Sequence, residues 1–283
     1  MSCFTLPSIA VDLYDMPIKA INSAGVSIDR VDLNDVLAGV PTVACYNESL
    51  DEIISSHKYW GDFELTQRLL KYAINKLKSK ILKSNILLSV PYDIVIGPFG
   101  AIFNRLLSEA ALQAGGREML AVENITCAAL GAGFPLKEHS KNWMLYSNEW
   151  CTYLFMTFAG SIVFSDIIEK PSHEIRIEEI QRLLKLLSDK VTTKLPNLFN
   201  RLELESTATN NLELNWSKSI DNKIYMIVPD SKKLEFGQWI GQYQVIYADN
   251  YEKCIIEGLG HLLRDISLFK PKQKMKKTHS SVF

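Results

Sequence analysis

The side chains that most often bind metals or act as nucleophiles are scattered along this chain. None of the five histidines has an i, i+4 histidine partner or a carboxylate neighbour suited to a metal, so surface or core positions suit them better. The five cysteines form no CxxC pair, which argues against a thiolate zinc site and a disulfide framework. GxSxG, Cys/His and P-loop signatures are also missing from the sequence. We therefore predict no metal site and no nucleophilic catalysis.

A cluster of positive charge lies in residues 269–283. Pro271 opposes helix formation there, and few apolar residues are available for packing, so we predict a disordered tail. Most such runs are simply solvated, but near anionic lipid each lysine can contribute about 1 kcal/mol. A solvated tail and a weak peripheral membrane contact both stay open. The lysines concerned are Lys270, Lys272, Lys274, Lys276 and Lys277.

Composition limits the classes of protein to which the chain can belong. It has 283 residues, 47% hydrophobic and 22% charged, which is ordinary for one large globular domain or two modest ones. Its net charge of −1 gives no overall attraction to nucleic acid. The longest apolar run, residues 151–164, is shorter than the roughly 20 residues that span a bilayer. The scattered cysteines fit a reducing cytosol best, and no secretory signal is visible at Met1.

Strands and helices alternate in the first half of the chain. The helix after Asp62 has an apolar residue every fourth position, from Leu65 to Ile81, so it packs on one face. A second helix, from about Pro98 to Ala114, ends at two glycines. The small residues after Glu123 predict a helix that another backbone can approach closely. Strands are predicted at residues 8–13, 86–91 and 119–123.

The second half repeats this alternation less completely. We predict a hairpin through Ala159 and Gly160, one long or two short helices over 175–199, and a polar surface loop over 205–215. The apolar stripe of the helical segment is Ile177, Ile180, Leu184, Leu187 and Val191. The other elements are strands at 143–146, 153–158, 224–228 and 244–248 and a helix over 251–267. This alternation favours an α/β sheet with covered faces.

Four segments resemble the bacterial actin homologue MreB. VENITCAALGAGFPL (residues 122–136) is similar to the family signature IEEPMAAAIGAGLPV. Residues 61–74, 108–123 and 248–263 are similar to further family segments and occur in the family's order. The resemblance implies an actin-like (ribonuclease H-like) two-domain fold of the α/β class.

The resemblance also implies a domain organisation. The short interval between Ser165 and Glu178 suggests that the upper subdomains are reduced. We expect domain I over residues 1–138 and a shortened domain II over 139–250. A helix over 251–268 is expected to pack back on domain I, followed by the basic tail over 269–283.

The family's ATP-binding residues are changed at several matching positions. The glutamate that polarises the attacking water corresponds to Asn124, whose amide cannot accept a proton from water as a carboxylate can. The first phosphate hairpin, DLGTANT in the family, corresponds to DLYDMPI. Asp12 remains there, more as a relic or structural hydrogen-bonding group than as a catalyst. Tyr14 is bulky where the family has glycine, and Asp15 adds negative charge.

The second phosphate hairpin corresponds to residues 142–165. The metal-side aspartate becomes Tyr146, and three glycines become Asn148, Glu149 and Trp150. A third turn, which receives adenosine in the family, falls near residues 227–230. The aromatic residues of this region suit plain core better than a partner groove, with Trp150 as the position that could still line a groove.

These changes favour an actin fold without its reaction. We expect no enzyme activity and no cofactor, and a cytoplasmic scaffold or regulator of a cytoskeletal or envelope-associated assembly. A peripheral position at the inner membrane stays open. Its expected partner is a protein, either an intact MreB filament or an envelope or secretion component, and not nucleic acid. Two alternatives stay open: an adaptor of a secretion or pilus apparatus that binds a cytoplasmic peptide, and a residual ATP-binding filament protein.

Overall fold

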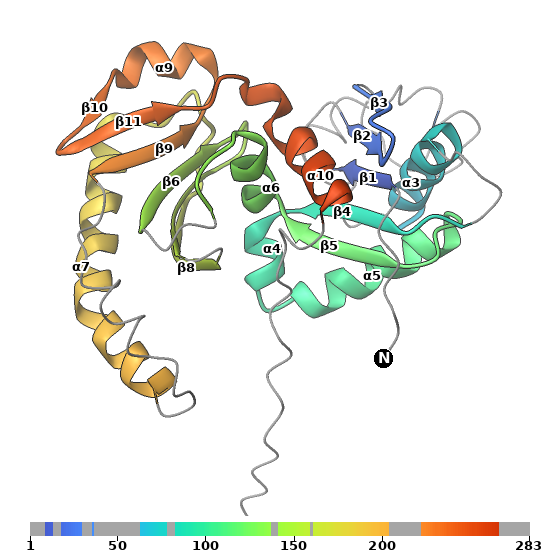
Figure 1. Ribbon diagram of the computed structural model, residues 1–283, viewed down its shortest axis with the longest axis horizontal. Coiled ribbons are helices and arrows are strands. Elements are labelled where there is room, and N and C mark those ends of the chain that lie inside the picture. The colour runs from blue at the N-terminus through green and yellow to red at the C-terminus, as the bar shows by residue number, and fades with distance from the viewer. Residues whose placement is uncertain are drawn as a thin grey trace, which may run out of the picture.

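A computed structural model shows two sheets side by side with two helices between them (Figure 1). It describes residues 9–13, 18–29, 36, 63–77, 83–136, 141–158, 161–203 and 222–265, without the side chains of 93 and 192–203. Predictions for Asp62, the 205–215 loop and the basic tail lie outside these residues.

The first sheet has five strands in the order β3-β2-β1-β4-β5. β1 and β2 are antiparallel, as are β2 and β3, whereas β1, β4 and β5 run parallel. Two helices, α3 (Phe63–Leu77) and α5 (Gly100–Gln113), contact each other and share a core cluster with the sheet. The strands are β1 (Ile9–Asp12), β2 (Lys19–Asn22), β3 (Ser27–Ile28), β4 (Ile86–Val90) and β5 (Met119–Glu123).

The central strand β4 shows why the sheet is covered on both faces. All five residues of ILLSV are buried, and Leu88 and Leu87 belong to two different apolar clusters. Such a continuous apolar run is typical of a parallel strand between two layers. α3 supplies one layer through its buried stripe, which includes Leu69 and Ala73. The predicted amphipathic helix is confirmed.

The second sheet has six strands in the order β10-β11-β9-β6-β7-β8. The long helix α7 (Ile177–Glu203) and the short helix α9 (Asp230–Phe236) cover its outer face, where their apolar residues join one cluster with the strands. The predicted stripe of α7 is confirmed from Ile180 to Val191, and Ile177 is half-buried. The strands are β6 (Asn142–Ser147), β7 (Thr152–Phe158), β8 (Ser161–Ile168), β9 (Lys223–Ile227), β10 (Trp239–Ile240) and β11 (Tyr243–Tyr247).

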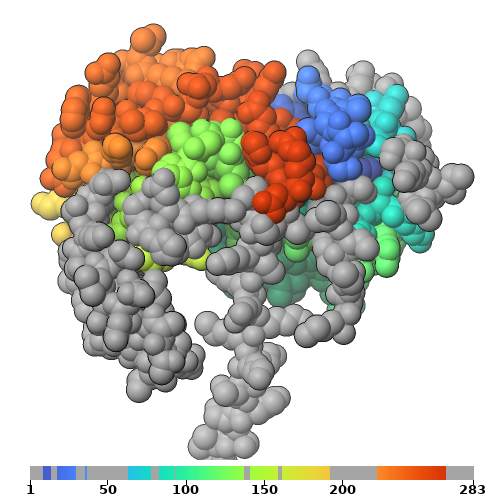
Figure 2. All heavy atoms as spheres, viewed as in Figure 1, coloured from blue at the N-terminus to red at the C-terminus, as the bar shows by residue number. Residues whose placement is uncertain are grey.

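Two helices cross between the sheets at very close range. α6 (Asn124–Gly131) and α10 (Cys254–Arg264) meet at the junction of the two halves (Figure 2). A Cβ added at Gly131 would lie 1.8 Å from the Cys254 carbonyl oxygen, and one at Gly258 would lie 1.9 Å from that of Cys127. This confirms that the small residues of α6 admit a second backbone, because no side chain fits at either glycine.

The structure differs from the predictions at several element boundaries. The helix predicted from Pro98 begins at Gly100 and is preceded by a separate short helix, α4 (Tyr92–Ile96). The segment after Asn250 starts with a 3-10 turn, η3 (Tyr251–Lys253), before α10. The 175–199 segment is a single helix. The β7–β8 hairpin is confirmed, although Ala159 and Gly160 themselves are not among the described residues. Among the described helices, none is long and apolar enough to cross a bilayer.

Candidate functional site

The candidate site lies at the junction of the two sheets. α6 follows β5 of the first half directly and contacts β6 of the second half. One apolar cluster crosses this junction, with Ala10 and Leu87 from the first sheet and Met144 and Phe155 from the second. Both α6 and α10 contribute to the same cluster. The junction of the two halves is therefore filled by buried side chains where these elements meet.

Asn148 closes the turn between β6 and β7. Its Oδ1 accepts hydrogen bonds from the backbone N–H groups of Trp150 and Cys151, both at 2.9 Å. Its own N–H donates to the Cys151 carbonyl at 3.0 Å, and its carbonyl accepts from the N–H of Ser172 at 2.7 Å. An Asn side chain commonly forms such a turn with the N–H two residues ahead. The N–H groups of Asn148, Trp150 and Cys151 are thus all satisfied within the turn, and Asn148 is buried.

Aromatic packing supports this turn from the strands. Tyr146 on β6 and Tyr153 on β7 are directly paired across the ladder and both are fully buried. Their rings stack with centroids 6.1 Å apart and planes inclined by 17°. Next to them, the hydroxyls of Ser147 and Thr152 are 2.5 Å apart. Tyr146 therefore acts as a core residue at this position.

Asn124 begins α6 and contacts the loop after β4. Its Oδ1 accepts from the N–H of Ile125 at 2.9 Å and from the N–H of Tyr92 at 3.2 Å. Its Nδ2 has no hydrogen-bond partner among the residues that the structure describes, and the side chain is fully buried. An amide in this arrangement joins α6 to α4 and offers no carboxylate to activate water.

Asp12 is fully buried at the end of β1, where it lies between Lys19 and Ser89 in the sheet register. Its negative charge also reaches Cys127 on α6. Burial first, and then the charges of Asp12 and Glu123, raise the pKa of the Cys127 thiol well above its ordinary value. Cys127 is therefore a neutral core thiol and not a nucleophile. Sequence patterns gave no sign of this proximity.

Tyr92 joins the two halves, a role that the sequence did not reveal. Its hydroxyl oxygen accepts a hydrogen bond from the Ser165 hydroxyl on β8 at 2.9 Å. Burial raises the pKa of Tyr92; the Ser165 bond lowers it in part, and Glu123 adds to the rise. Since α4 begins at Tyr92, this bond fixes the start of α4 against the second sheet.

Comparisons with known proteins agree on one family. A family model described as MreB/Mbl protein matches residues 60–185. The cell shape-determining protein Mbl of Bacillus cereus is 32% identical over 139 residues, and that of Bacillus subtilis is 31% identical over 132. Over residues 60–185 the chain is therefore MreB-like. The match covers 47% of this chain and 40% of the Bacillus cereus relative, so it spans less than half of either protein.

Solved structures extend the likeness of this MreB-like protein to the whole fold. Crystal structures of MreB5 of Spiroplasma citri bound to ADP and to AMPPNP superpose with TM-scores of 0.56 and 0.55. Each comparison covers 93% of this chain and 97% of MreB5, at 16% and 17% identity. At this identity the likeness establishes the actin-like fold, as the sequence predicted.

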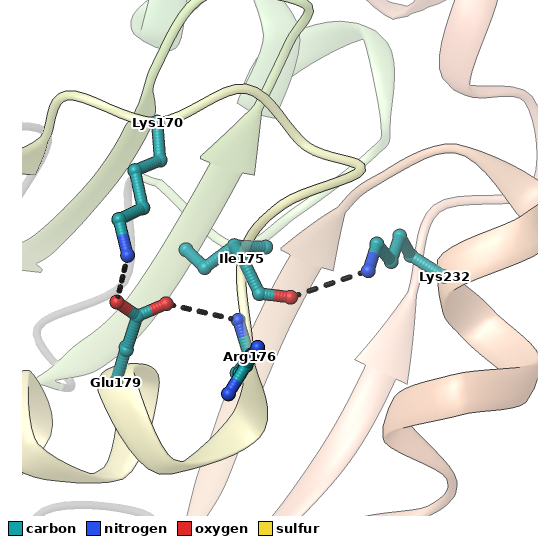
Figure 3. A network of polar contacts seen from close by, with 5 residues as sticks. All are labelled: Lys170, Ile175, Arg176, Glu179 and Lys232. Atoms are coloured by element: carbon teal, nitrogen blue, oxygen red, sulfur yellow. Dashed lines mark hydrogen bonds and ion pairs between the residues drawn. The ribbon is translucent and has the colours of Figure 1, made fainter.

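In the MreB-like protein, an ion pair and hydrogen bonds hold the segment between β8 and α7 against α7 and α9 (Figure 3). Lys170 binds Oε1 of Glu179 at 2.5 Å, and Oε2 of Glu179 accepts the N–H of Arg176 at 3.1 Å. These bonds lower the pKa of Glu179, with the Lys170 contact as the largest cause. Lys232, only 7% exposed, donates to the Ile175 carbonyl at 3.2 Å. A charged cavity of about 670 Å³ lies between these groups.

The remaining predicted site residues differ in their placement. Glu149 is exposed at the β6–β7 turn, and Trp150 is half-buried against the cluster that crosses the junction. Pro229 and Asp230 lie where β9 passes into α9. Tyr14 and Asp15 lie outside the described residues, as do Lys270, Lys272, Lys274, Lys276 and Lys277.

Proposed function

We propose that this MreB-like protein is a non-catalytic scaffold or regulator of a cytoskeletal or envelope-associated assembly. The observation that carries the proposal is the internal satisfaction of the β6–β7 turn by Asn148. A phosphate-binding turn needs free N–H groups that point at the ligand. Here two of those groups already donate to a buried side chain, so a phosphate would have to displace it.

The residues present do not fit a magnesium nucleotide bound in the family's way. Magnesium is held through carboxylates and water, and the family's aspartate on β6 is replaced by buried, stacked Tyr146. Exposed Glu149 adds a negative charge beside the place of the phosphates. The side chain of Asn124 accepts two backbone hydrogen bonds, and it supplies no carboxylate that could act as a base. These three positions, together with Asn148, support loss of both binding and hydrolysis.

A scaffold role is supported by what remains intact. The named relatives are cell shape-determining proteins, and the matched residues 60–185 include α3, α5, α6 and the β6–β8 strands. The Tyr92–Ser165 bond and the shared apolar cluster hold the two halves in one arrangement. A protein without nucleotide control would present a constant surface to its partner.

Titration calorimetry with ATP and magnesium tests the proposal. We expect no saturable heat up to millimolar ATP, while an intact MreB measured alongside binds. Saturable binding with a micromolar dissociation constant, worth about −8 kcal/mol, would contradict it and favour a residual ATP-binding filament protein. Pelleting of intact MreB with and without this protein then tests the scaffold role, which requires co-sedimentation or altered assembly.

The adaptor alternative concerns a different use of the same junction. It assigns the cytoplasmic peptide of a secretion or pilus apparatus to a groove beside Trp150. Trp150 is only half-buried, so part of its surface is available to a ligand. Crosslinking from this position to a membrane-protein tail, without any filament partner, would favour the adaptor. Peripheral membrane contact through the lysines of residues 269–283 stays a prediction.

A further inference from the structure

The free edge of the second sheet differs from the other sheet edges. β8 is the last strand in the order, and among the described strands it pairs only with β7. It has eight residues, whereas β3 and β10 have two each and β5 has five. Proteins commonly shorten or block such edges, because unpaired N–H and C=O groups attract other strands. β8 is long enough to accept a complete additional strand.

β8 also has few of the side chains that usually protect an edge. Its sequence, SIVFSDII, contains no Lys, Pro or Gly, and residues 162–168 are half-exposed. Asp166 is its one charged residue. Oδ2 of Asp166 pairs with Lys190 of α7 at 3.4 Å, and Oδ1 accepts the N–H of Ile167 at 3.0 Å. The edge is therefore apolar, with its single charge already engaged.

The hydrogen bond of Ile167 shows which residues point outward. In an antiparallel pair, alternate residues turn their N–H and C=O groups toward the neighbouring strand. The N–H of Ile167 donates to a side chain, so Ile167 belongs to the outward set. Ser165 lies two residues earlier in the same regular register, opposite Phe155, and so belongs to the same set.

Exposed apolar side chains occur on the segment of the first half that contacts β8. Tyr92 of α4 binds Ser165, so the start of α4 lies beside the middle of β8. From the end of α4 to the first turn of α5, Ile96 (51%), Phe99 (71%) and Ile102 (68%) are exposed to solvent. On the other side α7 runs past the end of β8 (Figure 1). The backbone edge of β8 is thus linked through Tyr92 to a segment with an exposed apolar surface.

We propose that an extended segment of a partner protein adds as a strand to β8, with apolar side chains directed at Phe99 and Ile102. In such strand addition, main-chain bonds supply affinity and side-chain contacts supply specificity. Because β8 lies between α7 and α4, a single extended chain reaches it more readily than the edge of a second folded copy. The inference deepens the proposed scaffold function by naming its docking surface.

A random octapeptide library displayed on phage, panned against the full chain, provides the probe. Selected peptides are resynthesised with a fluorescent label, and their binding is measured by anisotropy. We expect alternating apolar residues in the selected peptides. N-methylation of alternate amides in one register should weaken binding at least tenfold, and methylation in the other register should not.

Matched variants locate the site. Ser165→Pro removes one outward N–H and should weaken binding at least tenfold, whereas Ser165→Ala removes only the hydroxyl bond to Tyr92 and should bind nearly as wild type. Phe99→Asp with Ile102→Asp should also weaken binding tenfold. Leu234→Asp with Trp239→Asp, which alters two exposed apolar residues elsewhere, should not. Circular dichroism checks that each variant is folded. If Ser165→Pro does not fold, the N-methylated peptides test the strand pairing in its place.

Three results would overturn the proposal. They are failure to select any peptide, equal binding to Ser165→Pro and Ser165→Ala, and insensitivity of the selected peptides to N-methylation in both registers. A dimer of the chain that Ser165→Pro abolishes, without peptide selection, would assign the edge to a second copy instead. Saturable ATP binding in calorimetry would contradict the proposed function and leave the peptide result unaffected, so the two failures are distinguishable.

Discussion

The two halves of the molecule are built on the same strand order and differ in their turns. The first sheet runs β3-β2-β1-β4-β5, and the second runs β8-β7-β6-β9-β11 with β10 added at its edge. In each, three antiparallel strands are followed by two parallel ones. In each half one parallel strand, β4 or β9, is followed by a Val-Pro pair and then by a helix. The prolines are Pro91 and Pro229.

The helices that close the two halves also correspond. α6 contains Cys127 and Gly131, and α10 contains Cys254 and Gly258, four residues apart in each helix. Each cysteine carbonyl lies against the glycine of the other helix, so the crossing is nearly symmetric. The β6–β7 turn, in contrast, is closed by the side chain of Asn148. The helix crossing thus admits no added atom, whereas the turn depends on a side chain for its hydrogen bonds.

The largest effect is expected at the helix crossing. Gly131→Ala or Gly258→Ala places a methyl group within 2 Å of a backbone oxygen, at 1.8 and 1.9 Å respectively. We expect each to cost about 3 kcal/mol or more, because backbone atoms of two helices must separate. Chemical denaturation measures the change. Gly260→Ala on the same helix is the control, since its Cβ would meet only the end of the Ile21 side chain at 3.3 Å. An equal loss of unfolding free energy at all three glycines would contradict the claim that Gly131 and Gly258 are needed for the close helix crossing.

A smaller effect is expected at the β6–β7 turn. Asn148→Ala leaves the N–H groups of Trp150 and Cys151 without their acceptor and should cost about 1 to 2 kcal/mol. Amide hydrogen exchange at these two residues should become faster. Glu149→Ala, at an exposed neighbour, is the control and should change neither quantity. Unchanged exchange in Asn148→Ala would show that the turn does not depend on this side chain.

The contact between the halves should contribute less. A double-mutant cycle of Tyr92→Phe and Ser165→Ala should give a coupling energy of about 1 kcal/mol, because one neutral hydrogen bond at 2.9 Å is removed. Denaturation of the four proteins measures it. Additive losses would mean that the bond does not hold the two halves together.

The smallest effect is expected from alkaline pH. Burial raises the pKa of Tyr92 in the folded state. Its contribution to the free energy of unfolding is therefore fully present at pH values below about 10, the pKa of tyrosine in the unfolded chain. That contribution is lost as pH rises above 10, because the unfolded chain releases the proton first. Denaturation at pH 9 and pH 11 should therefore show a larger loss for the wild type than for Tyr92→Phe. Equal losses would contradict the assignment.

Much of the fold could be predicted from local patterns. The fourfold spacing in α3 and the continuous apolar run of β4 are set by neighbours in the chain, and both elements formed where expected. The small residues of α6 predicted a close helix contact, although not its partner α10. The short helix α4 was missed, because Pro91 and Pro98 mark turns and five residues give little periodicity.

The candidate site was only partly predictable. Resemblance placed Asn124, Tyr146 and Asn148 at the junction, and the structure shows the contacts that they make. Tyr92 and Cys127 were not identified, because each depends on a partner far away in sequence: Ser165 for Tyr92 and Asp12 for Cys127.

The sequence by itself determined the alternation of strands and helices and the residue types of the β6–β7 turn, since both are properties of adjacent positions. Only the tertiary structure decided which hydrogen bonds that turn makes and which of the described strands lies at the edge of the second sheet. Asn148 accepts its hydrogen bonds because the β6–β7 turn brings two N–H groups to its side chain. β8 is an edge strand because it comes last in the order of the six strands. Strand order arises from packing between distant segments, and the Asn148 bonds depend on the backbone geometry of the turn, and local periodicity encodes neither.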